Sequence, residues 1–141
     1  MSRFEQSVMR AVVLGDLPAM KVNQHLGLWN EEVSADDEAV LIAPCTRVDR
    51  REGDMMLLAT KKSLVLHKVP WIRQVKPHLV LTRSSLHAVS WGPHSKYVQS
   101  VVLKLATPDS IVELALPAPQ PDQVRAVDQA LEACFGEQPS R

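Results

Sequence analysis

Side chains that could do chemistry are few in this sequence and widely spaced. The histidines are His25, His67, His78, His87 and His94. No two of them stand four residues apart, the spacing that places two metal ligands on one helical face. His67, His78 and His87 are expected on strands and could meet in space, but zinc requires three or four ligands with supporting partners. We therefore expect ordinary surface or edge histidines and no metal site.

Nucleophilic and acid–base catalysis also lack a recognisable arrangement. Cys45 has no general base near it in the sequence, and no Gly-x-Ser-x-Gly, P-loop or Gly-x-Gly-x-x-Gly pattern occurs. The acidic runs at 31–32 and 36–38 are expected in a solvated linker, which does not provide the desolvation that acid catalysis needs. We expect no enzymatic activity and no cofactor. Cys45 and Cys134 are expected as buried thiols, with one long-range disulfide as the alternative.

Length and composition indicate one globular domain. The chain has 141 residues, of which 45% are apolar and 23% charged, and its formal net charge is zero. This composition is ordinary for a folded domain, and the length is sufficient to bury a core. Zero net charge argues against a protein that is basic all over and coats nucleic acid.

The charge is unevenly distributed along the chain. Residues 47–87 hold nine basic and three acidic residues, a net charge of +6, whereas residues 1–46 carry −4 and residues 88–141 carry −2. The candidates for an anionic-surface site are Arg47, Arg50, Arg51, Trp71, Arg73 and Lys76. They are expected in strand connections, where an apolar tip beside basic residues suits a membrane interface. The alternative is that these charges only solvate loops and edge strands.

The sequence shows no sign of export or membrane insertion. The start, Met1–Gln6, has an acidic residue where a signal peptide has basic ones. The longest apolar runs, such as 55–59, are far shorter than the roughly 20 residues that cross a bilayer. We expect a cytoplasmic protein.

Residues 1–37 are predicted to form an N-terminal helical extension with an acidic linker. Apolar residues recur at helical spacing in two short helices between Ser2 and Glu32. These residues are Phe4, Val8, Val12, Leu26 and Trp29. Their apolar area is too large to leave in water. They are expected either to pack on the rest of the chain or to form an interface with a second subunit or partner.

The rest of the chain is predicted to be mainly β with a final helix. Apolar runs between turn signals predict strands at 39–43, 55–60, 63–68, 79–81, 86–91, 98–105 and 110–116. The stripe Val124, Val127, Leu131 and Cys134/Phe135 predicts a helix over 122–135, with Pro121 suited to its first turn and Gly136 to its end. An antiparallel sheet must protect its edges, so we expect a small barrel or orthogonal sandwich closed by this helix.

Residues 38–135 resemble bacterial pleckstrin-homology-like (PH-like, GRAM-related) domains. The resemblance rests on the hairpin over 53–66, the strand region 79–91, the hairpin over 98–116 and the helix over 122–135. It implies a seven-stranded antiparallel barrel with a C-terminal capping helix over residues 38–136. Residues 137–141 are expected to form a disordered tail. The strand over 54–60 contains no Lys or Arg, unlike the lipid-binding members, so the resemblance assigns no ligand residues.

The functions that the family implies are protein–protein docking, scaffolding and phosphoinositide binding. We expect a non-enzymatic binding module that acts in protein interaction or scaffolding, with a protein partner or self-association. The first alternative is peripheral binding to anionic membrane lipids through the basic loops. Nucleic-acid binding is the less favoured alternative, because only Trp71 and Tyr97 offer exposed rings on which bases could stack.

Overall fold

The computed structural model describes residues 2–13, 19–48, 52–68, 77–93 and 100–136. Its helices are α1 (Arg3–Val8), α2 (Ala19–Glu32), the single-turn 3-10 helix η2 (Arg83–Ser85) and α3 (Pro121–Phe135). Its strands are β1 (Val12–Val13), β2 (Ala39–Arg47), β3 (Glu52–Thr60), β4 (Ser63–Lys68), β5 (Pro77–Thr82), β6 (Ala88–Pro93), β7 (Ser100–Ala106) and β8 (Ile111–Pro117). The mainly β character and the C-terminal helix are confirmed.

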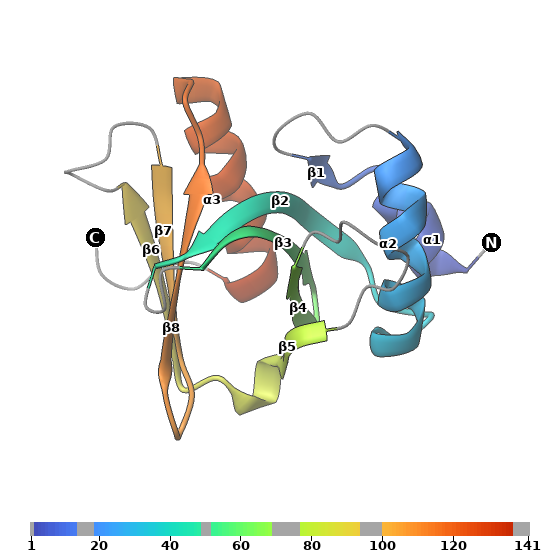
Figure 1. Cartoon of the computed structure of the whole chain (residues 1–141), viewed down its shortest axis with the longest axis horizontal. Helices are drawn as coiled ribbons and strands as arrows, with labels where there is room; N and C mark the ends of the chain where they lie inside the picture. Colours follow the sequence, from blue (N-terminus) through green and yellow to red (C-terminus); the bar gives the residue numbers. More distant parts are fainter. Residues whose placement is uncertain (1, 14–18, 49–51, 69–76, 94–99, 137–141) are drawn as a thin grey trace.

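The strands form one sheet that is antiparallel except at β1. The order across the sheet is β5-β4-β3-β2-β8-β7-β6, and the two-residue β1 pairs in parallel with β2. The sheet curves between β2 and β8, so that β6–β8 stand on one side of the molecule and β2–β5 on the other (Figure 1). It does not close, because β5 and β6 end the order and have no ladder between them in the described ranges. Of the barrel and the orthogonal sandwich that were expected, the closed barrel is therefore not formed.

Several element boundaries differ from the predicted ones; strand β3, for example, begins at Glu52 and not at residue 55. The strand expected to end before Pro44 continues to Arg47. Pro44 lies between the β2 residues that pair with β1 and those that pair with β8, where the ladder on that side is interrupted and a missing N–H costs no bond. Val12, expected on the first helix, belongs to β1, because α1 ends at Val8. Gly92 and Pro93, expected in a turn, complete β6.

Both faces of the central strands are buried, which accounts for their unbroken apolar runs. On β3, Met55, Leu57 and Ala59 point into the core shared with α3 and β6–β8. Met56 and Leu58 point the other way, into a second core with α1 and α2. Strand β3 is thus the wall between two cores, and no residue in 55–60 is exposed.

Helices α1 and α2 cover the outer face of β2–β4. Phe4, Val8 and Trp29 are buried there against Ile42 and Val65 of the sheet. The backbone N–H of Phe4 also donates to the carbonyl of Ala35 at 3.1 Å. Figure 1 shows the two helices side by side at one end of the molecule. The N-terminal segment therefore packs in cis, as part of the single chain.

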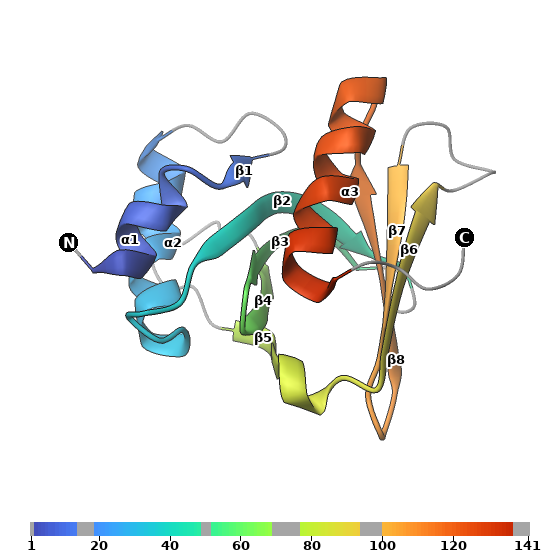
Figure 2. The ribbon, with the colours of Figure 1, turned by 180° about the vertical axis from the view of Figure 1, so that it is seen from behind.

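The predicted C-terminal helix is confirmed as α3. It begins at Pro121, with the backbone N–H of Gln120 donating to Oε1 of Gln123 at 3.0 Å, and it ends at Gly136, whose φ of 80° favours glycine. Val127, Leu131 and the other stripe residues face the sheet, and α3 lies against β2, β6 and β7 (Figure 2). Among the described helices, none has the length and apolar character needed to cross a membrane.

Candidate functional site

The structure describes little of the predicted basic surface. Arg47 lies at the end of β2 and is buried, with 4% of its surface exposed. Arg50, Arg51, Trp71, Arg73 and Lys76 lie outside the described residues, as does Tyr97. A role of these side chains at an anionic surface stays a prediction.

The apolar residues proposed for a partner interface lie in the chain's own core or at its margin. Phe4, Val8 and Trp29 are buried beneath the sheet. Leu26 is half-buried against this same core, and Val12 is half-buried against the core on the other side of the sheet. An interface built from the three buried side chains would require α1 and α2 to leave the sheet, so this role also stays a prediction.

Two histidines are buried, contrary to the expectation of surface or edge positions. His67 on β4 has no exposed surface and His25 on α2 has 1%. Their ring centroids lie 4.7 Å apart, and His67 also contacts Trp29. His87 is exposed, before the start of β6, and does not belong to this buried group. Within the described ranges, no group of three or more His, Cys, Asp or Glu side chains could hold a metal ion.

The two cysteines are free thiols inside the core that α3 shares with the sheet. Cys45 on β2 and Cys134 on α3 are both buried. Burial raises the pKa of each thiol to about 12. Because the thiolate is the nucleophilic form, neither side chain is prepared for catalysis at neutral pH. The two cysteines do not form the disulfide that was the alternative.

Among the residues that the structure describes, strand β5 is an edge of the sheet, and its ladder fixes which amides point outward. The backbone N–H of Arg83 donates to the carbonyl of Lys62 at 2.9 Å, in the register that pairs Thr82 with Ser63. Hydrogen-bonded and non-bonded pairs alternate along an antiparallel ladder. The N–H groups of Thr82 and Val80 therefore point away from β4, toward the open side of β5.

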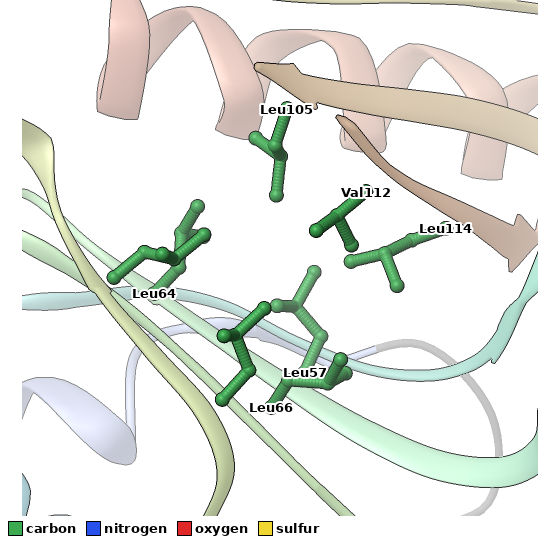
Figure 3. A pocket seen from close by; sticks show the side chains of 8 residues that line it. Leu57, Leu64, Leu66, Leu105, Val112 and Leu114 are labelled. Atoms are coloured by element: carbon green, nitrogen blue, oxygen red, sulfur yellow. The ribbon is translucent and has the colours of Figure 1, made fainter. Parts of the chain in front are cut away.

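An aliphatic pocket lies directly beside this edge. Its walls come from β3, β4 and β5 on one side and from β7 and β8 on the other, and Figure 3 shows their side chains converging. The lining residues are Leu57, Leu64, Leu66, Leu79, Leu81, Leu105, Val112 and Leu114. The space inside the pocket is small, about 10 Å³ or room for one water molecule, and it is partly open to solvent. The pocket is narrow, so a guest side chain must be small or must displace leucine rotamers.

The end of β5 is anchored by its following turn. In η2, the Arg83 guanidinium donates to the carbonyl of Lys61 at 3.1 Å and lies 5.7 Å from the centre of the Phe135 ring on α3. The β3–β4 turn that carries Lys61 is itself tied to the Glu38 carboxylate. Lys61, and then Arg3, lower the pKa of Glu38. This exposed network holds β5, the hairpin turn and α3 in one arrangement.

A buried hydrogen bond supports the same turn from below. Oγ1 of Thr60 donates to Oδ2 of Asp37 at 2.6 Å, and both side chains are buried. Thr60 Oγ1 also accepts from the backbone N–H of Ser63 at 2.8 Å, while the other Asp37 oxygen accepts from the N–H of Glu38. The turn between β3 and β4 is therefore fixed to the linker that follows α2.

The arrangement at β5 is suited to recognition and not to covalent chemistry. It combines outward-pointing backbone amides with an apolar pocket, and the pocket lining contains no titratable or nucleophilic side chain. Sequence reasoning did not single out Val80, Thr82 or the pocket residues. The available signal was the alternation in 79–82, where Leu79 and Leu81 share one face, but the sequence does not reveal which strand lacks a neighbour.

Comparisons with known proteins give no family assignment. No protein-family model matches the chain, and no curated protein is significantly similar to it.

Proposed function

We propose that this protein is a non-enzymatic, PH-like interaction module that binds an extended peptide segment along the free edge of β5. The observation that carries the proposal is the juxtaposition of that edge with the aliphatic pocket. Strand addition uses main-chain hydrogen bonds for affinity and pockets for alternate side chains for specificity. Both parts lie together at β5.

Support for a PH-like assignment comes from the topology. Strands β2–β5 and β6–β8 form two antiparallel meanders, which are joined where the first strand, β2, pairs with the last, β8. A single C-terminal helix then lies against the sheet. This order of elements is the one that the resemblance implies, although the sheet remains open between β5 and β6.

The geometry also indicates what kind of peptide would fit. A strand added to β5 would accept from the N–H groups of Val80 and Thr82 and would continue the alternation of faces. Residues on the same face as Leu79 and Leu81 would point into the pocket. The narrow pocket favours small aliphatic side chains such as alanine or valine at those positions, at a spacing of two residues.

The anionic-membrane and nucleic-acid alternatives depend on side chains outside the described residues. Lys61, Lys62 and Arg83 are basic and exposed near the end of β5, but Lys61 and Lys62 are ion-paired with Glu38 and Asp36. No described feature favours either alternative over peptide binding. A cytoplasmic location likewise stays a prediction.

The test uses a displayed library of random 12-residue peptides, selected on the full chain. A selected peptide is then synthesised and titrated into the isotope-labelled protein, followed by amide NMR. We expect the amides of Val80 and Thr82 to shift and to gain protection from exchange, with small aliphatic residues recurring at alternate peptide positions. If no peptide is selected, or if the bound peptide leaves β5 unaffected, the proposal is wrong.

A further inference from the structure

Two imidazole rings and one indole ring meet under the α1–α2 cover. His25 and Trp29 stand one helical turn apart on α2, and both face His67 on β4. The His25 and His67 centroids are 4.7 Å apart with an angle of 41° between the rings. Both histidines are essentially without exposed surface. In the described part of the contact between α2 and the sheet, two titratable side chains are therefore shielded from water.

The hydrogen bonds of His67 require its neutral form. The indole N–H of Trp29 donates to Nε2 of His67 at 3.2 Å, so Nε2 carries no proton. On the other side of the ring, Nδ1 lies 3.1 Å from the carbonyl oxygen of Lys68, so Nδ1 carries the proton and donates it. A proton on Nε2 would point at the indole N–H and abolish that bond. Burial lowers the pKa of His67, against a smaller opposing effect of the Lys68 carbonyl.

No described acidic side chain is in a position to neutralise a charge on this ring. From α2, the group that faces His67 is His25. The charged residues of α1, α2 and β4 whose side chains the structure describes lie at the surface, exposed or half-exposed: Arg3, Glu5, Glu31, Glu32 and Lys68. From β3, Met56 is the residue paired with His67. A second protonated imidazole would place two positive charges side by side in an apolar contact.

We propose that α1 and α2 form an acid-releasable cover, which opens when the His25–His67 pair takes up protons. Opening lets the rings reach water and bind protons freely, so acid favours the open form over the closed one. The face uncovered is apolar and consists of Ile42, Met56, Leu58 and Val65. Acidification would therefore present a second interaction surface, on the opposite side of β3 from the pocket.

The size of the effect follows from linkage. A group whose pKa is lowered by folding removes stability as the pH falls below its unperturbed value, which is 6.5 for histidine. One unit below that value, the opening constant rises about tenfold for one imidazole that stays neutral when closed. It rises further if His25 takes up a proton on opening as well.

Native-state hydrogen exchange on the full chain tests the proposal, with rates corrected for the intrinsic effect of pH. Between pH 7.5 and pH 5.5, amides in residues 25–32 of α2 should lose protection at least about tenfold. Amides in α3 should change less than about twofold, because no buried histidine contacts that helix in the described chain. An equal loss of amide protection in α2 and α3, or no loss in α2, would contradict the proposal that the cover opens in acid.

Two variants test whether the pH effect on α2 comes from the buried pair His25 and His67. Replacing both buried rings, His25→Gln with His67→Gln, should reduce the pH effect on α2 to less than about twofold, because glutamine does not titrate. His87→Gln, the same change at an exposed histidine, should retain the full effect. If the double variant does not fold, the wild-type comparison of α2 with α3 still decides between the outcomes. A full pH effect in a folded double variant would contradict the proposal.

Discussion

The guanidinium of Arg83 lies 5.7 Å from the centre of the Phe135 ring, so the turn after β5 is joined to the last residue of α3. The same guanidinium donates to the carbonyl of Lys61 in the β3–β4 turn. Strand β5 has no neighbouring strand on its outer side in the described chain, yet its end is held at two points. Fixing an edge before binding reduces the ordering cost of adding a strand to it.

The α1–α2 cover should be part of the folding core. Phe4→Ala should lower the free energy of unfolding by about 3–5 kcal/mol, because it removes a fully buried ring and leaves a cavity. Met9→Ala, one residue beyond α1, should change it by less than about 0.5 kcal/mol, because Met9 is 77% exposed. Urea denaturation followed by circular dichroism measures both values. Similar small effects in the two variants would show that the helices do not contribute to the core.

The buried hydrogen bond between Thr60 and Asp37 should contribute more to the free energy of unfolding than the exposed hydrogen bond of Thr107 in the β7–β8 turn. Thr60→Val should cost about 1–3 kcal/mol, because it leaves the buried carboxylate of Asp37 without that donor. Thr107→Val in the β7–β8 turn removes a comparable but exposed hydroxyl, which bonds to Ser110, and should cost less than about 1 kcal/mol. Urea denaturation of both variants gives the comparison. A Thr107 variant as unstable as the Thr60 variant would contradict this account of the turn.

Both cysteines should be unreactive in the native protein. Their pKa values of about 12 leave them protonated at pH 8, and burial excludes the reagent. A chromogenic disulfide reagent should therefore label neither Cys45 nor Cys134 before unfolding and both in denaturant. Fast labelling of one thiol in the native state would show that the core around it opens locally.

Local patterns in the sequence were sufficient to predict most elements. The runs over 55–60 and 63–68 predicted a hairpin, and the stripe that includes Val127 and Leu131 predicted α3, because these signals depend on neighbouring residues alone. Strand β3 was predicted from its apolar run, but not that both of its faces are covered, one of them by α1 and α2. That the cover is formed by the chain's own N-terminal helices was one of two alternatives, since apolar spacing does not distinguish packing in cis from packing on a partner.

The candidate sites depended on contacts that local patterns do not encode. His67 was expected at the surface or at a sheet edge, but it is buried and meets His25, 42 residues earlier in the sequence, because α2 packs on the outer face of β4. The free edge at β5 follows from β2 pairing with β8, which joins residues almost 70 positions apart. Such pairings are decided by the packing of the whole sheet.

The most direct test of the β5 site is the affinity of a selected peptide for two variants at Thr82. Thr82→Pro removes the outward N–H and requires only a small change from the native φ of −87°, whereas Thr82→Val removes the hydroxyl but keeps the N–H. Isothermal titration calorimetry should show binding at least about tenfold weaker for the proline variant and within about threefold of wild type for the valine variant. Equal affinity for both variants, with the fold intact by circular dichroism, would contradict strand addition at β5.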